Sequence, residues 1–410
     1  GKDNLNGTFY ADAKDLDISP WLEQLNPSDK DLAFARVNMT LWADINDSQP
    51  TSLQADINDS RFRWKDGTTL DLQLIDGNFS AKPTGSEWHY AIHDLQLQIN
   101  QHEPVSLNFR GKRTALGELE MHTDRLGLGS VFPLAALFMP QQRFAELSQL
   151  DPQADITGLS VAVDGAGTAL ALEFKDFSTT QTALVPGLRD LSGRMDWRYN
   201  KGRLQFDAQD STLHSELLLG NNLDYQQLAG DIYFSLEEQQ LSITAPQIHF
   251  DSKNVQLTQA LHYQSGNNNL SLLTRIEEMA VENARDYFPG ELMGKGTQSY
   301  LQRALVSGRI EQASVLWHGP VDQFPFAEDQ GVFQARVAIK DSEFDFDSNW
   351  PSLTELDMQL LFENESLTMT SQTGKLQDLE IGEVTAVIPR LVSDAILSID
   401  IDTRSSGEHV

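Results

Sequence analysis

The feature that most constrains this chain is an alternation of apolar and polar residues with a period of two, which recurs along most of its 410 residues. In the segment DLQLQIN, for example, Leu95, Leu97 and Ile99 alternate with polar residues. Successive side chains of a β-strand point to opposite faces, so each such segment predicts a strand with one apolar and one polar face. Short turns such as KDG, IDG and NKG separate the segments at the spacing of β-hairpins.

This alternation also selects the candidate residues of a shared apolar face. Only two short segments have a helical pattern, which is too little to cover so many strands with a second layer. We therefore expect an all-β fold, an elongated, twisted, mostly antiparallel sheet that curls into an apolar groove. Periodicity alone leaves an alternative open, in which the apolar face packs against a second sheet as a closed core. The candidate groove residues are Leu95, Leu97, Ile99, Val105, Leu107, Phe109, Leu204, Phe206, Ile232, Phe234, Leu241, Ile243, Val315, Trp317, Phe333, Val337, Leu356, Met358, Leu360 and Phe362.

The two interruptions of the strand pattern predict helical insertions at residues 124–152 and 283–308. The first has a helix-like pattern at residues 141–150, after two prolines. The second contains TQSYLQRALVSG, an amphipathic helix that we expect to stop at Gly308. Its predicted buried stripe consists of Tyr300, Leu301, Ala304 and Leu305.

A weak internal repeat supports a sheet that is built from hairpins. LSGRMDWRYNKGRLQF begins at Leu191, LAGDIYFSLEEQQLSI begins at Leu228, and the similar LDMQLLFENESLTM begins at Leu356. Each copy is an apolar alternation, a polar turn and a second alternation. Repeated hairpins indicate one continuous array, with groove segments at 1–123, 153–282 and 309–410 separated by the helical insertions.

Composition and motifs exclude several classes of function. The chain has 60 acidic and 30 basic residues, a net charge of −30, so it should repel nucleic acid. It has no cysteine, which excludes disulfides and cysteine-ligated metals. Phosphate loops, nucleophile elbows and zinc helices are absent, and no carboxylate pair suggests a glycosidase. We expect no enzyme activity and no cofactor.

Two copies of the segment DINDS, at residues 44–48 and 56–60, leave one metal alternative open. Their carboxylate and amide oxygens are ligand types that calcium prefers. The competing interpretation is a strand end followed by a turn, because Asn, Asp and Ser hydrogen-bond their own backbone there. We predict no metal site and keep calcium as the alternative.

The segment HGPVDQFPFAEDQGVF, which begins at His318, predicts a corner of the sheet. Glycines and prolines in it are typical of turns and bulges that redirect strands. The aromatic residues Trp317, Phe324, Phe326 and Phe333 would supply apolar surface near the bend. The sequence leaves open whether this surface serves the groove or the packing of the preceding helix.

Residues 286–369 resemble the YhdP family, large AsmA-like proteins of Gram-negative bacteria that are related to TamB and the bridge-like lipid transfer proteins. Outside these residues, the resemblance lies in the repeated amphipathic hairpins. The matching elements are Tyr287 and Pro289, the helix end at Gly308, Gly319 before Phe324 and Phe326, Gly331 with Phe333, Trp350 with Pro351, and Leu353.

This resemblance implies a non-catalytic conduit that moves phospholipid between the inner and outer membranes along an apolar groove. It implies a periplasmic location, with anchoring by an N-terminal helix of the full-length protein. The ends of the chain, GKDNLNGTFY and SSGEHV, suggest an excised piece of that protein. The expected partners are phospholipid acyl chains and, through segments outside this chain, the two membranes. The alternative function is a structural or adhesive β-protein with a closed core.

Overall fold

The computed structural model describes residues 4–20, 31–65, 70–137, 139–182, 185–238, 240–284, 287–288, 295–326, 328–347, 349–391 and 396–403. The strands within these residues form one 23-stranded antiparallel sheet with a few short helices. This confirms the predicted all-β class. The chain divides into two units by its internal contacts, Gly1–Thr180 with Ser192–Tyr199 and Gln181–Leu191 with Asn200–Val410.

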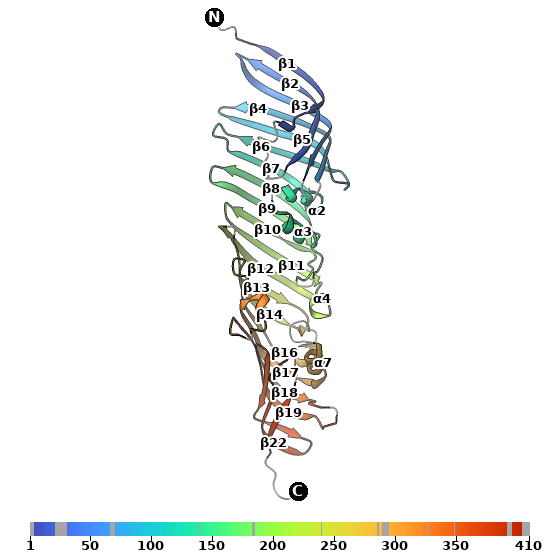
Figure 1. The fold of residues 1–410 in the computed structure, drawn as a ribbon, viewed down its shortest axis with the longest axis vertical. Helices are drawn as coiled ribbons and strands as arrows, with labels where there is room; N and C mark the ends of the chain where they lie inside the picture. The colour runs from blue at the N-terminus through green and yellow to red at the C-terminus, as the bar shows by residue number, and fades with distance from the viewer. Residues whose placement is uncertain are drawn as a thin grey trace. The chain divides into compact units, whose positions relative to one another are not determined.

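In the first unit, strands β1 to β9 pair antiparallel in chain order (Figure 1). A helical insertion separates β7 from β8, as the sequence predicts. The elements are β1 (Gly7–Asp17), β2 (Leu32–Asn46), β3 (Gln49–Trp64), β4 (Leu70–Thr84), β5 (Glu87–Ile99), β6 (Val105–Arg113), β7 (Leu119–Gly127), α2 (Leu128–Val131), the 3-10 helix η1 (Phe132–Leu137), α3 (Gln141–Ser148), β8 (Gln153–Asp164), β9 (Gly167–Ser178) and β10 (Leu191–Arg198).

In the second unit, each long strand from β11 to β19 also pairs antiparallel with the next long strand. The short β16 pairs with β17, and β20 to β23 complete the sheet. The elements are β11 (Lys201–Leu213), α4 (Glu216–Leu219), β12 (Leu223–Glu237), β13 (Gln240–Asp251), β14 (Gln256–Gln264), β15 (Asn269–Ile276), β16 (Met279–Ala280), α5 (Val281–Ala284), α7 (Lys295–Ala304), β17 (Leu305–Pro320), the 3-10 helix η3 (Val321–Gln323), β18 (Val332–Phe344), β19 (Leu353–Glu363), β20 (Ser366–Ser371), β21 (Gly374–Leu376), β22 (Leu379–Ile388) and β23 (Ser398–Thr403).

The repeat units that begin at Leu228 and Leu356 are hairpins, as predicted. In the first, β12 and β13 pair up to Glu237 opposite Gln240, and the turn lies between them. In the second, β19 and β20 pair up to Glu363 opposite Ser366. The two-residue period therefore sets the pairing as well as the faces, since a slip by one residue would turn every apolar side chain to the other face.

Aspartates at β-bulges recur along the sheet and account for part of the acidic composition. Asp15, Asp59, Asp94, Asp176 and Asp341 all have positive φ, between 33° and 54°. Each lies where the pairing of its strand shifts by one residue. Aspartate tolerates this left-handed conformation better than most residues with a side chain, and a bulge increases the local twist of a strand. A period-two pattern contains no signal for these positions.

The helices of the insertions are shorter than predicted. In the first insertion, α3 ends at Ser148, within the predicted 141–150. In the second, α7 ends at Ala304 and β17 begins at Leu305, so the prediction of a helix stop at Gly308 is wrong. Gly308 instead lies within β17 at φ 140°, where a Cβ would come within 3.0 Å of Ser342 on β18. The absence of a Cβ at Gly308 therefore lets β17 and β18 approach each other closely. From the sequence alone, a glycine with this role cannot be distinguished from one that caps a helix.

Pro289 and the glycine-rich residues 290–294 lie outside the described residues. Within the described residues, no helix is long and apolar enough to span a bilayer.

Candidate functional site

A continuous row of apolar residues crosses the sheet of the second unit. Each member is the direct cross-strand partner of the next, from β12 to β23, and every member is aliphatic, aromatic or methionine. Side chains at directly paired positions lie on the same face of a sheet, so the row forms one uninterrupted apolar stripe. In order of pairing it consists of Leu228, Phe250, Leu257, Ile276, Ala313, Val337, Leu360, Met369, Ala386 and Ile399.

An apolar cavity of about 360 Å³ lies over this face. Its walls come from strands β14 to β19 and from α5 and α7. Among the described residues of the wall, the polar side chains are Tyr287 and Asn364, and none is charged. The Asn364 Oδ1 accepts a hydrogen bond from the Phe333 backbone N–H over 2.9 Å, and the Tyr287 hydroxyl lies 3.3 Å from the Ser252 hydroxyl. The Asn364 Oδ1 and the Tyr287 hydroxyl are thus engaged with protein.

Helices α5 and α7 form the side of the cavity opposite the sheet. Val281, Leu301 and Ala304 are each 0% exposed, and Val281 and Leu301 line the cavity. The predicted stripe is confirmed at Leu301 and Ala304 of α7, which are buried, whereas Tyr300 is half-buried and the buried Leu305 belongs to β17. Figure 1 shows α7 beside β17, and contacts between these two elements agree with that view.

The helix α7 is fixed by specific polar contacts as well as by its apolar stripe. At its N-terminal end the buried Thr297 hydroxyl donates to the Leu391 carbonyl over 3.0 Å. At its C-terminal end the Ala304 carbonyl accepts from the Asp345 N–H over 2.8 Å. Burial against the sheet raises the pKa of Tyr300 to about 12, so the phenol is neutral at physiological pH. These contacts hold the helix over the apolar stripe.

The aromatic corner belongs to the wall of this cavity. Phe324 and Phe333 line it, and Trp317 stacks on Phe324 with ring centroids 5.1 Å apart. Phe326 is 1% exposed and packs against Trp317. A Cβ at Gly331 would lie 2.7 Å from the Phe326 ring, so the glycine leaves the space that this ring fills. The sequence leaves open whether these aromatic residues serve the groove or the packing of the preceding helix. Phe324 and Phe333 line the cavity, so these two rings contribute apolar surface to it.

The opposite face of the second unit carries hydrogen-bonding and charged side chains, together with the exposed cross-strand pair Leu273 and Leu316. The Ser271 hydroxyl and the His318 Nδ1 lie 2.9 Å apart across β15 and β17. The Lys340 ammonium donates to the Asp357 carboxylate over 2.7 Å, which lowers the pKa of Asp357. The sheet therefore separates an apolar face from a hydrated one, as the period of two predicts.

The candidate groove residues of the second unit fall into two groups. Val315, Phe333, Val337, Leu360 and Phe362 line the cavity. The second group does not line the cavity, and its buried members are Phe206, Trp317, Leu356 and Met358. Its half-buried members are Leu204, Ile232, Phe234, Leu241 and Ile243. Among these, Leu204 lies opposite Ile232, and Phe234 lies opposite Ile243.

The sequence reading missed part of the cavity wall. Leu257 and Ile276 belong to the apolar row, yet β14 and β15 carry Gln259 and Thr274 on the same face, which obscures the alternation. Met279 lies in the two-residue strand β16 and Phe288 lies between α5 and α7, where no period can be recognised. A search for direct cross-strand partners of known apolar residues would have found the two strand residues.

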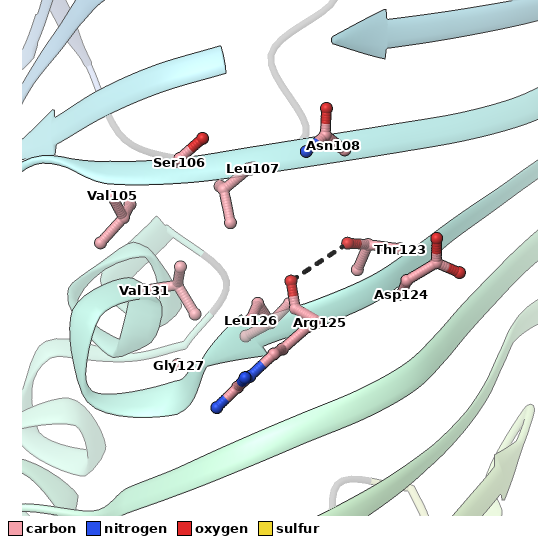
Figure 2. Close-up of a pocket in the computed structure, with 10 residues that line it drawn as sticks. All are labelled: Val105, Ser106, Leu107, Asn108, Thr123, Asp124, Arg125, Leu126, Gly127 and Val131. Carbon is pink, nitrogen blue, oxygen red and sulfur yellow. Dashed lines mark hydrogen bonds between the residues drawn. The ribbon is translucent and has the colours of Figure 1, made fainter. Parts of the chain in front are cut away.

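In the first unit, the candidates Leu97, Ile99 and Leu107 are buried, and Leu95, Val105 and Phe109 are half-buried. Leu95 is paired with Leu107, and Leu97 with Val105. A cavity of about 400 Å³ lies between β6 and β7, and Val105 and Leu107 contribute to its lining (Figure 2).

The DINDS carboxylates are used for local structure. Asp44 accepts hydrogen bonds from the hydroxyls of Thr8 and Ser52, which lower its pKa. Asp47 has φ 49° at the turn between β2 and β3, and Asp59 lies at a bulge. Among the described residues, no three His, Cys, Asp or Glu side chains gather closely enough to hold a metal ion. The predicted strand end and turn is confirmed for residues 44–48, whereas residues 56–60 lie within β3 at a bulge, so the turn interpretation is wrong for the second segment.

Comparison with known proteins places the chain in a family. The family described as YhdP protein matches residues 2–410. The intermembrane phospholipid transporter YhdP of Escherichia coli (strain K12) is 24% identical over 427 residues, which cover 99% of this chain and 34% of that protein. The chain thus spans about a third of the length of this curated relative. No solved structure matches the chain. Since the family match extends from residue 2 to the last residue, the chain belongs to the YhdP family.

Proposed function

We propose that this chain is a segment of a periplasmic conduit that carries phospholipid between the inner and outer membranes along a hydrophobic groove, without catalysis. The observation that carries the proposal is the apolar row from Leu228 to Ile399, together with the cavity that lies over it. The relative of this chain is named as an intermembrane phospholipid transporter, which supports phospholipid as the cargo.

The physical basis is the cost of exposing acyl chains to water. Transfer of a methylene group out of water is worth about 0.8 kcal/mol, so a chain of about sixteen carbons gains on the order of 12 kcal/mol in an apolar environment. A row without a polar interruption lets the chain slide while most of this gain is kept. Movement along such a face needs no nucleophile, metal or nucleotide, because no covalent bond changes.

The cavity has the properties of a lipid-binding segment of this path. Its volume of about 360 Å³ lies within the usual range of small-molecule sites. The Asn364 Oδ1 and the Tyr287 hydroxyl already have protein partners, so covering these two atoms with an acyl chain costs less than burying unpaired groups. The polar opposite face and the net charge of −30 oppose lateral adhesion to anionic bilayers.

Native mass spectrometry of the purified chain tests the proposal. A conduit segment retains phospholipid after purification, and Leu360→Asp should remove it, because Leu360 lines the cavity. Gln359→Asp is the matched control, since Gln359 is exposed on the opposite face of the same strand. Circular dichroism checks that strand content is kept. A chain that binds no lipid in any form would instead support the structural protein with a closed core.

A further inference from the structure

The sheet of the first unit is open between two consecutive strands. Pairing of β6 with β7 runs from Arg113 opposite Leu119 to Arg110 opposite His122 and ends there. Beyond that point, residues 105–109 pair with β5 and residues 123–127 pair with β8. Figure 2 shows the two strands diverging, with Val131 of α2 at the opening. The cavity of about 400 Å³ occupies this opening.

The lining of the opening changes character from one face of the sheet to the other. Leu107 and Leu126 are 4% and 8% exposed and belong to the apolar face, where Val105 and Val131 join them. Ser106, Asn108, Asp124 and Arg125 are exposed and also line the cavity. The opening is therefore lined by buried apolar residues and by exposed polar residues.

The helical insertion covers the apolar face next to this opening. The helix α2 contacts β7 and β8, and η1 contacts β4. Ala136 of η1 is 3% exposed, and Leu70 and Ile99 on the sheet are 3% and 1% exposed. A ligand that moves along the apolar face of this unit would therefore reach the helical insertion beside the opening between β6 and β7.

The backbone at the opening favours an occupant with polar groups. Unpaired strand edges present N–H and C=O groups to the gap, and each such group costs about 1–3 kcal/mol if it is buried without a partner. Arginine guanidinium groups stand on the polar side, where Arg110 lies 3.1 Å from Asp124 and Arg125 lies 2.7 Å from Asp155. A phosphate group can replace a carboxylate as a bidentate partner of arginine.

We propose that the opening between β6 and β7 is a lateral port, in which a phospholipid from a bilayer keeps its acyl chain on the apolar face and its headgroup on the polar face as it passes the helical insertion. This inference rests on the proposed conduit function. The amphipathic lining selects a phospholipid over a fully apolar ligand, because only one side of the port is apolar.

A reversible disulfide across the port provides the test, since the chain has no cysteine of its own. Asn108→Cys with Asp124→Cys places the two thiols at facing positions of the strands that diverge from the Arg110–His122 pair. A disulfide requires Cα atoms within about 7 Å, so its formation closes the port. Gln54→Cys with Ser80→Cys is the matched control, because these residues are direct partners on the continuous pairing of β3 and β4.

The readout is labelling by vesicles of phosphatidylethanolamine and phosphatidylglycerol that carry a photoreactive acyl chain, followed by peptide mapping. We expect labelling of residues 105–109 and 123–131 in the reduced protein. Oxidation should reduce the yield of this labelling about tenfold, which corresponds to a penalty of about 1.4 kcal/mol for lipid occupancy of the port. Labelling of β17 to β19 and of the control should not change. Ser106→Trp fills the port without oxidation and should reduce the labelling in the same way, whereas Gln54→Trp should not.

The outcomes separate the port from the conduit. Equal labelling of the open and the closed port overturns the port, as does labelling of β17 to β19 without labelling of residues 105–109. An extended polypeptide that crosslinks at the port in place of lipid overturns the lipid assignment. Absence of lipid labelling anywhere in the chain contradicts the proposed function itself.

Discussion

A carboxylate at position 337 should abolish lipid retention while leaving the fold intact. Val337 lies in the apolar row between Ala313 on β17 and Leu360 on β19, and it lines the cavity. It is half-buried, so in the lipid-free chain the carboxylate of Val337→Asp stays in contact with water. The penalty therefore arises when an acyl chain covers the position.

The magnitude follows from two contributions. Loss of the isopropyl group removes contact worth about two methylenes, or about 2 kcal/mol. Stripping water from even a neutral polar group costs about 1–3 kcal/mol more by protein mutational data, and an ionised carboxylate costs more than that. The sum is at least about 4 kcal/mol, which weakens acyl-chain binding by about 1,000-fold or more. Because binding disfavours the ionised form, the pKa of the new carboxyl rises in the complex, so the deficit should shrink as the pH falls through that raised value and should level off below about 4, where the free chain is protonated as well.

Displacement of a fluorescent fatty acid, read together with native mass spectrometry, measures this effect. The control is Ala338→Asp, since Ala338 is the next residue and lies opposite Gln312 and Gln359 on the polar face. We expect the control to bind like the unmodified chain. Equal loss of binding in Val337→Asp and Ala338→Asp, or full binding by both, would refute the assignment of the apolar face as the binding surface.

Three further predictions concern the scaffold. Gly331→Ala should lower the free energy of unfolding by about 1–3 kcal/mol, because its Cβ would lie 2.7 Å from the His318 carbonyl, whereas Gly165→Ala, with nothing within 4 Å, should be near neutral in urea titrations. At the bulge with φ 49°, Asp94→Gly should be tolerated, but Asp94→Val should cost about 1–3 kcal/mol in thermal unfolding; equal melting temperatures would count against the bulge argument. The hydrogen bond from Lys340 lowers the pKa of Asp357, so its stabilisation is present above 3.8 and is lost as the pH falls through the lowered value. Asp357→Asn should therefore melt below the unmodified chain at neutral pH and converge with it in acid, and a constant difference would contradict this.

The strands and their apolar face were predictable because one physical rule, alternation across a pleated sheet, governs both. The period of two predicts that Leu360 and Phe362 share one face of their strand, and both line the cavity. The same rule carried no information on where the chain departs from a regular ladder. Asp94 lies in a segment that reads as a regular strand, yet it forms a bulge.

The failures share a cause, since each depends on contacts between segments that are distant in sequence. Gly308 has the signature of a helix cap, but the approach of Ser342 on the neighbouring strand decides its conformation. The opening between β6 and β7 was not predicted, because Val105 and Leu107 alternate like residues of any paired strand. The helix α2, which contacts β7 and contributes Val131 to the opening, lies more than ten residues beyond β6 in the sequence.

The most direct test of the central claim is a photocrosslinking scan along residues 359–363 of β19, one position at a time, in the presence of phospholipid vesicles. Leu360 and Phe362 line the cavity, whereas Gln359, Leu361 and Glu363 alternate with them on the other face. The account predicts lipid adducts at 360 and 362 alone, with Leu361 as the decisive control, since it is apolar but faces outward. Adducts of similar yield at 361, or none at 360 and 362 in a chain that retains lipid, would contradict it.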